Sequence, residues 1–387
     1  MVLRNLFMIL PLTLSILNAI DLANNIKGDV QYYYYGIDKD NTDNSYASAV
    51  GGNVEYRSEK IYRFGILLGW TSSNILNADN AKPTRLFNND TTEVSNINAI
   101  SQANIFYQNS KTYFKFGSQK LDTPLLNSTS GRVVPWTFNA VNMLYTPYTH
   151  LHIDIGYVDT IRSNTSNIYK KDSASGKLED GVYYLGLKES LNKHAVLTMY
   201  YYNAPKLYDS IYLQYRYSRV HKSDLYCFAV QYIRTYKNGG DSSNASLTKN
   251  NGGYDTNLIG AKVGLFYENL QLQLAMTKNF GLSGIDKAYG GIVSLYTSSM
   301  IADGTGAYKP TAYSFKSILD LGENIEAELA LTKVEFDDYR GTAYNAIYAG
   351  AKYYLSQYTT AHLRYEKLFP SDTLNQHYTR FILKYKF

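Results

Sequence analysis

Apolar and polar residues alternate along most of the chain beyond residue 28, in segments of about ten residues. Residues 211–217, 270–276 and 361–365 show the pattern clearly, with Leu, Ile, Tyr, Met or Ala on one side and Gln, Arg or His on the other. Successive side chains of a strand point to opposite faces, so this pattern predicts strands with one apolar and one polar face. Helical periodicity is almost absent, and we therefore expect an all-β protein.

The connections between these segments alternate between short and long. Short links of two or three residues lie at 58–59, 109–110, 148–149, 190–192, 268–269, 322–323 and 356–357. Loops rich in Asn, Asp, Ser and Gly lie at 72–95, 119–137, 161–180, 237–253 and 281–309, with shorter ones near 37–46, 204–208, 337–341 and 369–375. A transmembrane antiparallel β-barrel has this arrangement, with short turns in the periplasm and long loops outside, whereas a soluble sandwich has no reason to separate its loops in this way. We predict about 18 strands, with residues 290–296 inside a long folded loop.

Both ends of the chain indicate an exported outer-membrane protein. Residues 1–19 combine Arg4, a short apolar run and Ala19, which predicts a signal peptide, and residues 20–387 are then the barrel. The apolar run is too short for a membrane-spanning helix, which needs about 20 residues. The last segment alternates aromatic or aliphatic residues with polar and basic ones and ends in Phe387, as in barrels whose terminal aromatic residue is read by the barrel-assembly machinery. The expected surroundings are the bacterial outer membrane, its lipid bilayer and lipopolysaccharide.

Composition and charge exclude several classes of function. The 40 tyrosines suit two interfacial belts of amphipathic rings and a lumen lined by polar-tipped rings. A formal net charge of +5 with dispersed Lys and Arg argues against nucleic-acid binding. Cys227 is the only cysteine, so neither an intramolecular disulfide nor a cysteine-based metal site is expected. The six histidines have no spacing to an acid and a nucleophile that indicates catalysis, and no phosphate-binding or zinc motif occurs. We expect neither an enzyme nor a cofactor.

Strand parity predicts which charged residues face the lumen if Leu, Ile and Tyr face lipid. A charge facing hydrocarbon at the bilayer midplane costs about 2–4 kcal/mol, which favours this assignment for central positions. The basic set comprises Arg63, Lys115, Lys188, Arg216, Lys262, Lys316, Lys352, Arg364, Arg380 and Lys384, and the acidic set comprises Glu55, Asp154, Asp320, Glu326, Glu328 and Glu366. Such residues either solvate the wall and pair with each other or select solutes by charge. The basic excess favours anionic or zwitterionic solutes.

Residues 121–140 form the most distinctive loop, the third long one in our strand assignment. This stretch resembles the third loop of the OprD-type (outer-membrane porin D) family, which folds into the barrel and narrows the pore. The matching residues are Thr123, Pro124, Leu125, Arg132, Pro135, Thr137 and Phe138. The strand count and the length of the chain agree with that family. The resemblance implies that Asp122 and Arg132 are pore-constriction residues. With strand parity, it also implies a lumenal basic ladder that includes Arg63, Arg216, Lys262, Lys316, Lys352, Arg364 and Arg380.

The chain departs from the family pattern at two places. Residues 129–131 are Thr-Ser-Gly where an acidic residue commonly precedes a Ser-Arg pair, and Ala140 replaces a usual glycine. Family members divide between basic amino acids and carboxylates as solutes, and these departures leave that choice open. We expect a porin that allows passive, charge-selective diffusion of small polar solutes, as a monomer or a trimer. The alternative is a surface adhesin or structural anchor with little transport, although an anchor needs far fewer strands.

Overall fold

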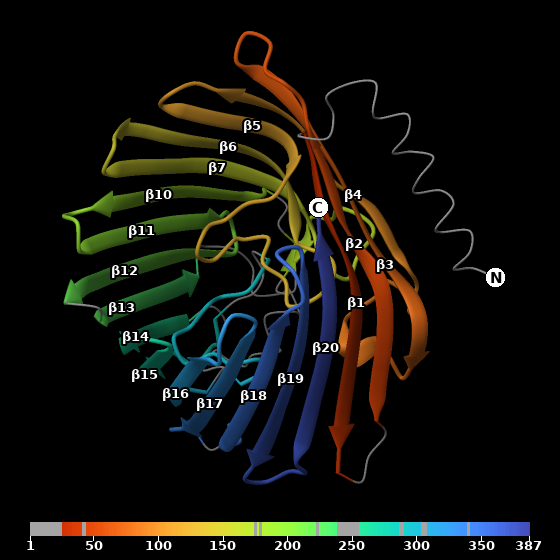
Figure 1. The fold of residues 1–387 in the computed structure, drawn as a ribbon. Helices are drawn as coiled ribbons and strands as arrows, with labels where there is room; N and C mark the ends of the chain where they lie inside the picture. Colours follow the sequence, from red (N-terminus) through yellow and green to blue (C-terminus); the bar gives the residue numbers. More distant parts are fainter. Residues whose placement is uncertain are drawn as a thin grey trace.

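Eighteen antiparallel strands close into one barrel in the structure, a computed structural model (Figure 1). It describes residues 25–40, 44–173, 176–177, 180–221, 224–237, 255–285, 290–302, 308–338 and 341–387. The barrel strands are β1 (Ile26–Lys39), β2 (Ser45–Arg57), β3 (Phe64–Asp79), β4 (Ile97–Gln108), β5 (Thr112–Gln119), β6 (Thr137–Tyr148), β7 (Leu151–Arg162), β10 (Val182–Ser190), β11 (Ala195–Ala204), β12 (Tyr208–His221), β13 (Asp224–Lys237), β14 (Asp255–Tyr267), β15 (Leu270–Asn279), β16 (Pro310–Asp320), β17 (Ile325–Phe336), β18 (Tyr344–Tyr354), β19 (Thr359–Pro370) and β20 (Gln376–Lys386).

Two short elements lie in the loops. A 3-10 helix spans Lys82–Thr84, and β8 (Asp172–Ser173) pairs with β9 (Gly176–Lys177). Among the described residues, no helix is long and apolar enough to cross a membrane. The expected signal peptide, residues 1–19, lies outside the described residues.

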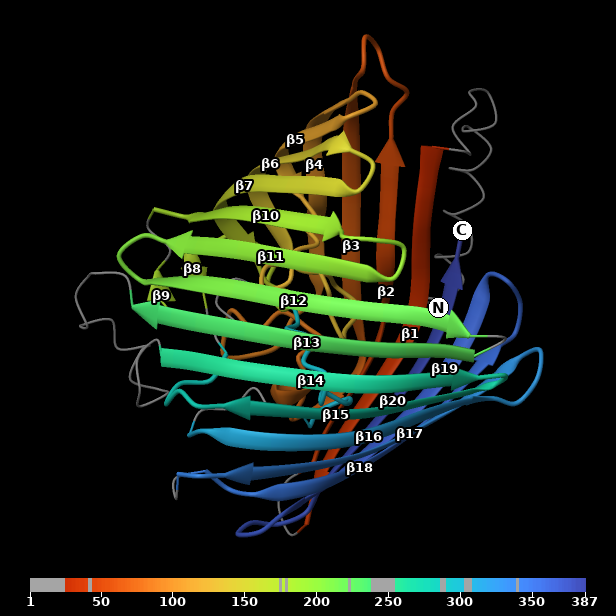
Figure 2. The ribbon, with the colours of Figure 1, turned by 90° about the vertical axis from the view of Figure 1, so that its left-hand side faces the viewer.

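Side chains alternate between the two faces of the barrel wall as the pattern predicts. On β3, Leu68 and Trp70 are exposed on the outside, while Thr71 and Ser73 are buried on the inside. The outer face is therefore apolar and the inner face largely polar, which is the arrangement that a lipid bilayer requires. The tight turns gather at one end of the barrel and the long loops at the other (Figure 2).

The expected strand count is confirmed, and two details of the prediction are wrong. Residues 290–296 form no strand and lie in the loop between β15 and β16, as predicted. Residues 72–79, assigned to a loop, continue β3, which stays paired with β2 up to Asp79 through a bulge at Leu76. Arg63 does not face the lumen. It is exposed in the turn between β2 and β3, where Tyr62 and Arg63 both have positive φ and the neighbouring residues Ile61 and Phe64 form a bridge.

The barrel closes where β1 meets β20, and Gly28 lies at this seam. Its amide donates to the carbonyl oxygen of Phe387 at 2.9 Å, and the Phe387 amide donates back at 3.0 Å. A Cβ on Gly28 would lie 2.6 Å from both the Phe387 ring and the carbonyl oxygen of Asn53. The terminal aromatic ring therefore covers the seam only because residue 28 has no side chain.

Gly28→Val is expected to weaken the seam, because overpacking of this kind costs about 1–3 kcal/mol. The measurement is the temperature at which the purified barrel loses its folded band in a heat-modifiability gel. Val30→Ile, on the lipid-facing side of the same strand, serves as the control. Equal transition temperatures for Gly28→Val and the wild type would contradict this account of the seam.

Candidate functional site

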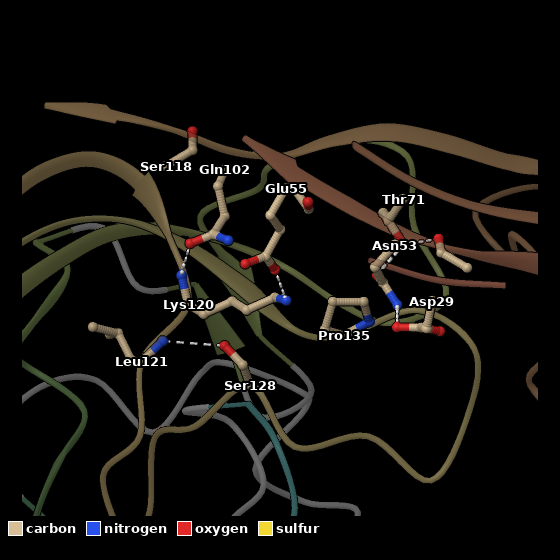
Figure 3. A network of polar contacts seen from close by, with 12 residues as sticks. Asp29, Asn53, Glu55, Thr71, Gln102, Ser118, Lys120, Leu121, Ser128 and Pro135 are labelled. Carbon is tan, nitrogen blue, oxygen red and sulfur yellow. Dashed lines mark hydrogen bonds and ion pairs between the residues drawn. The ribbon is translucent and has the colours of Figure 1, made fainter. Parts of the chain in front are cut away.

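The third loop (residues 120–136) leaves β5 under a group of polar contacts with the barrel wall (Figure 3). Lys120 forms an ion pair with Glu55 of β2, and its amide donates to the side chain of Gln102 at 3.4 Å. The ammonium group of Lys115 donates to the Lys120 carbonyl oxygen at 2.9 Å. Glu55 and Lys115 thus face the lumen, and both fix the start of the loop.

The same loop then crosses the interior of the barrel. Near its beginning, Tyr202 of β11 accepts a hydrogen bond from the amide of Leu125 at 3.2 Å. Near its end, Tyr33 of β1 donates to the carbonyl oxygen of Gly131 at 2.6 Å. Counted around the wall from β1, β11 is the ninth of the eighteen strands, so the two anchors lie on opposite walls. The loop therefore spans the lumen, as Figure 1 shows.

Arg132 holds the end of the third loop against β1. Its guanidinium carbon lies 4.5 Å from the centre of the Tyr35 ring, and its Nε donates to the carbonyl oxygen of Thr84 at 2.7 Å. Arg380 of β20 also lies 4.5 Å from the centre of that ring. Burial, together with the nearby charge of Arg380, lowers the pKa of Arg132 to about 10, so the guanidinium stays charged at neutral pH. Arg132 lies in the third loop, and these contacts fix the end of that loop to the barrel wall.

A second segment, the seventh loop, also folds into the barrel in its described residues 280–285, 290–302 and 308–309. Tyr296 accepts a hydrogen bond from the Gln214 side chain at 2.9 Å, and its carbonyl oxygen accepts one from Gln273 at 3.0 Å. Lys262 lies 4.8 Å from the centre of the Tyr296 ring, and Lys316 donates to the carbonyl oxygen of Ser298. Two of the predicted ladder residues therefore contact a loop directly.

Glu366 of β19 fastens the far end of the seventh loop. Its side chain is fully buried and accepts hydrogen bonds from the Ser299 hydroxyl, from the Ile301 amide at 2.6 Å and from the Ala302 amide at 3.2 Å. A carboxylate that receives three donors is well satisfied away from water. Glu366 is lumenal in direction, but it is covered by the loop that it binds.

Asn127 joins the two inward loops. Its side-chain amide donates to the carbonyl oxygen of Ile292 at 3.1 Å and accepts from the Ile292 amide at 3.3 Å. Its backbone amide donates to the carbonyl oxygen of Gly290 at 3.3 Å. The third and seventh loops thus form one connected layer inside the barrel.

A cavity of about 280 Å³ remains between this layer and the wall formed by β10 to β13. The third loop contributes Asp122 to it, and the wall opposite contributes Lys188 of β10 and Arg216 of β12. The other lining residues are Thr123, Pro124, Asn127, Thr129, Val196, Thr198, Tyr200, Tyr212, Gln214, Gln231, Ile292 and Ser294. An acidic loop thus faces a basic wall across a narrow polar space. Asp122 lies toward this wall, whereas Arg132 lies toward the opposite one beside Tyr35.

The remaining predicted residues are distributed along the inner wall. Arg364 donates to the Tyr348 hydroxyl at 3.1 Å, and Tyr348 donates to Glu328. Lys352 donates to the Tyr354 hydroxyl at 2.5 Å. Asp320 and Glu326 border a cavity of about 430 Å³ at the tight-turn end, away from the loop layer. Asp154 accepts hydrogen bonds from Asn142 and Tyr200, and Lys384 lies 3.5 Å from Asp29.

A family model described as outer membrane porin, OprD family, matches residues 80–309, which include both inward loops. The chain belongs to this family. OprD-family proteins are channels of the bacterial outer membrane and not enzymes. The tight-turn end of the barrel is accordingly periplasmic and the long-loop end extracellular.

Solved structures of the same fold agree with this assignment. Acinetobacter baumannii OccAB4 superimposes with a TM-score of 0.80 at 15% identity, over 94% of this chain and 97% of that one. Pseudomonas aeruginosa OccK9 (OpdG) gives 0.82 at 13% identity, over 93% and 97%. Pseudomonas aeruginosa OpdK, solved with vanillate, gives 0.79 at 15% identity, over 94% and 99%. At these identities the likeness shows the fold alone. A search of curated protein sequences found no match.

Sequence reasoning missed several residues that line the cavity. Tyr200, Tyr212 and Gln214 have the strand parity of lumenal positions, so the alternation that identified the charges also contained them. Ile292 and Ser294 come from a loop without periodicity, and no pattern in the sequence indicated that they would reach the third loop.

Proposed function

We propose that this OprD-family channel gives passive, charge-selective diffusion of small polar solutes through the space between Asp122 and the β10–β12 wall. The observation that carries the proposal is the cavity itself, which has one carboxylate on the loop and two cations opposite. Opposed charges align a solute that has an anionic group and a second polar group, because each end meets a complementary charge.

The size of the cavity supports small solutes such as amino acids and carboxylates. Its volume of about 280 Å³ lies just below the range of about 300–1,000 Å³ found for pockets that bind drug-sized ligands. The structurally similar OpdK was solved with vanillate, a small carboxylate. The two cations against one carboxylate favour anionic or zwitterionic solutes over cationic ones in this channel.

Ion selectivity in planar bilayers tests the proposal. In a KCl gradient, we expect Arg216→Gln to lower the ratio of chloride to potassium permeability by about twofold or more and Asp122→Asn to raise it. Arg219→Gln is the matched control, since Arg219 lies on the lipid-facing side of the same strand. Opposite shifts from the first two variants, and none from the control, support a charge-selective space at this position.

A folded barrel that conducts no ions would overturn the proposal and favour the adhesin or anchor. Conductance with unchanged selectivity in both variants would keep the channel and move the selective region elsewhere. We also propose that residues 1–19 are removed during export, on the basis of Arg4 and the short apolar run that follows it. N-terminal sequencing of the protein purified from outer membranes tests this cleavage.

A further inference from the structure

Four basic side chains point away from the lumen near the extracellular end of the barrel. They are Arg234 of β13, Lys278 of β15, Lys333 of β17 and Lys367 of β19. Each one is flanked in its strand by residues buried on the inner face. These flanking residues are Ile233 and Thr235, Thr277 and Asn279, Thr332 and Val334, and Glu366 and Leu368. Because side chains alternate along a strand, the four cations face the lipid.

Strand register places the four cations at one depth. Asn257 pairs with Arg234 and its carbonyl oxygen accepts a hydrogen bond from Phe280, and Lys278 is two residues before Phe280. Lys278 pairs with Thr311, which pairs with Glu335, and Lys333 is two residues before Glu335. Lys333 pairs with Asn345, which pairs with Phe369, and Lys367 is two residues before Phe369. The shift between successive cations is therefore two residues each time.

The repeated two-residue shift follows from the tilt of the strands. A line drawn from Ala229, in the first half of β13, to its partner on each following strand reaches Lys39 at the extracellular end of β1. Paired residues thus move toward the extracellular end from strand to strand. Constant depth therefore requires a step of about one residue per strand back toward the periplasm. A rise of about 3.3 Å over a strand spacing of about 4.8 Å corresponds to a tilt of roughly 35°, which is usual for such barrels. The cations form a level row on alternate strands, with neighbouring positions about 12 Å apart, because two strand spacings combine with a shift of two residues.

The row occupies only one side of the barrel. The same two-residue step taken backward from Arg234 leads to Asn203 on β11 and then to Asp159 on β7. Taken forward from Lys367, it leads to Gly36 on β1. These positions carry no cation, so the four basic residues are not a general property of the extracellular rim.

An apolar groove lies on the periplasmic side of the row, on β13 to β18. It has a volume of about 660 Å³ and includes Val263, Leu274, Leu331 and Ile347, all of which are exposed on the outer face. Lys333 borders it. A groove that accepts hydrocarbon, with a cation at its extracellular end, has the polarity of a lipid molecule in the outer leaflet.

Three of the cations have acidic neighbours. Arg234 lies 3.1 Å from Asp255, Lys278 lies 2.5 Å from Asp337, and Lys333 lies 2.5 Å from Glu335. The Lys333–Glu335 pair is exposed, and exposed ion pairs contribute about 0–1 kcal/mol, so a phosphate can replace this carboxylate at little cost. Lys278 is largely covered and also donates to the Thr311 hydroxyl at 2.7 Å, but the Asp337 carboxylate is 59% exposed, so a phosphate can reach the same ammonium group in its place. The displaced carboxylates can then share a divalent cation with a phosphate, because oxygen ligands of both kinds suit Ca²⁺ and Mg²⁺.

We propose that the outer face of β13 to β19 binds a phosphorylated glycolipid of the outer leaflet, such as the lipid A part of lipopolysaccharide. An acyl chain lies in the groove, and the phosphates at the two ends of the headgroup contact Lys278 and Lys333. Charge complementarity in the level row and the groove beneath it together favour a lipid with two phosphates over one with a single phosphate.

Native mass spectrometry of the detergent-purified barrel with added lipids tests the proposal. The probes are bisphosphorylated lipid A, monophosphorylated lipid A and phosphatidylethanolamine. We expect lipid A with two phosphates to bind most tightly, and the double variant K278Q/K333Q to weaken its binding about 10- to 30-fold, since each basic residue contributes about 1 kcal/mol near an anionic surface. The control is K171Q/K206Q, which removes two lysines at the extracellular end outside the row.

Equal loss in the control, or equal binding of all three lipids, would overturn the proposal. The channel conductance of K278Q/K333Q is expected to equal that of the wild type, because both lysines lie outside the lumen. Loss of lipid binding with normal conductance therefore separates this site from the proposed solute path, and failure of the lipid site leaves the transport proposal untouched.

Discussion

Gly291→Val is expected to increase single-channel conductance about twofold or more, because it separates the two loops that fill the lumen. Gly291 has a φ of +90°, and a Cβ there would lie 2.2 Å from the carbonyl oxygen of Asn127. A β-branched residue at such a φ costs about 1–3 kcal/mol in strain before the clash is counted. The contacts of Asn127 with Gly290 and Ile292 are a few hydrogen bonds of about 1 kcal/mol each, so the strain is sufficient to break them.

The measurement is the conductance and current noise of the purified channel in planar bilayers. Gly322→Val is the matched control, because Gly322 has a φ of +123° with no atom within 4 Å of its Cβ position and lies in a periplasmic turn. Asn127→Ala should raise conductance in the same direction, since it removes both side-chain hydrogen bonds to Ile292. A conductance for Gly291→Val at or below that of Gly322→Val would show that the loop layer does not limit ion flow.

The alternation of side chains carried most of the fold prediction. A strand has a period of two residues, so residues such as Arg216 and Lys262 could be placed on the inner wall before their neighbours were known. Arg63 has the same parity and still lies outside the wall. The positive φ values of Tyr62 and Arg63 place both residues in a turn, and the regular strand begins only at Phe64. Parity applies only within a strand, and the sequence did not mark where β3 begins.

The candidate site was harder to predict, because loops decide which lumenal residues meet solute. Lys262 and Lys316 face inward, but Tyr296 and Ser298 cover them. These contacts involve a backbone oxygen and an aromatic face, and neither kind of contact produces a repeating pattern in the sequence. The third loop was identifiable through its resemblance to a family. The seventh loop had no such signal, although its Ile292 and Ser294 line the cavity.

Glu366→Leu is expected to release residues 299–302 from the wall and to raise conductance as well. The substitution removes the acceptor of three hydrogen bonds, and bonds to a charged group contribute about 1.5–3 kcal/mol each. It also leaves the amides of Ile301 and Ala302 without that partner in a buried place, and such groups favour solvent over the interior. The loop should therefore leave the wall while the strand stays in the sheet.

Limited proteolysis and conductance together measure this release. Cleavage within the seventh loop should become faster in Glu366→Leu by about tenfold or more, with an intermediate rate for Glu366→Gln, which keeps one acceptor oxygen. Glu326→Leu is the control, because Glu326 borders the periplasmic cavity away from the loop layer. If Glu366→Leu resists cleavage as well as the control does, the hydrophobic contacts of Tyr296 with Ala229 and Ala275 must hold the loop without the carboxylate. If it is cleaved but conducts as the wild type does, the third loop alone narrows the channel.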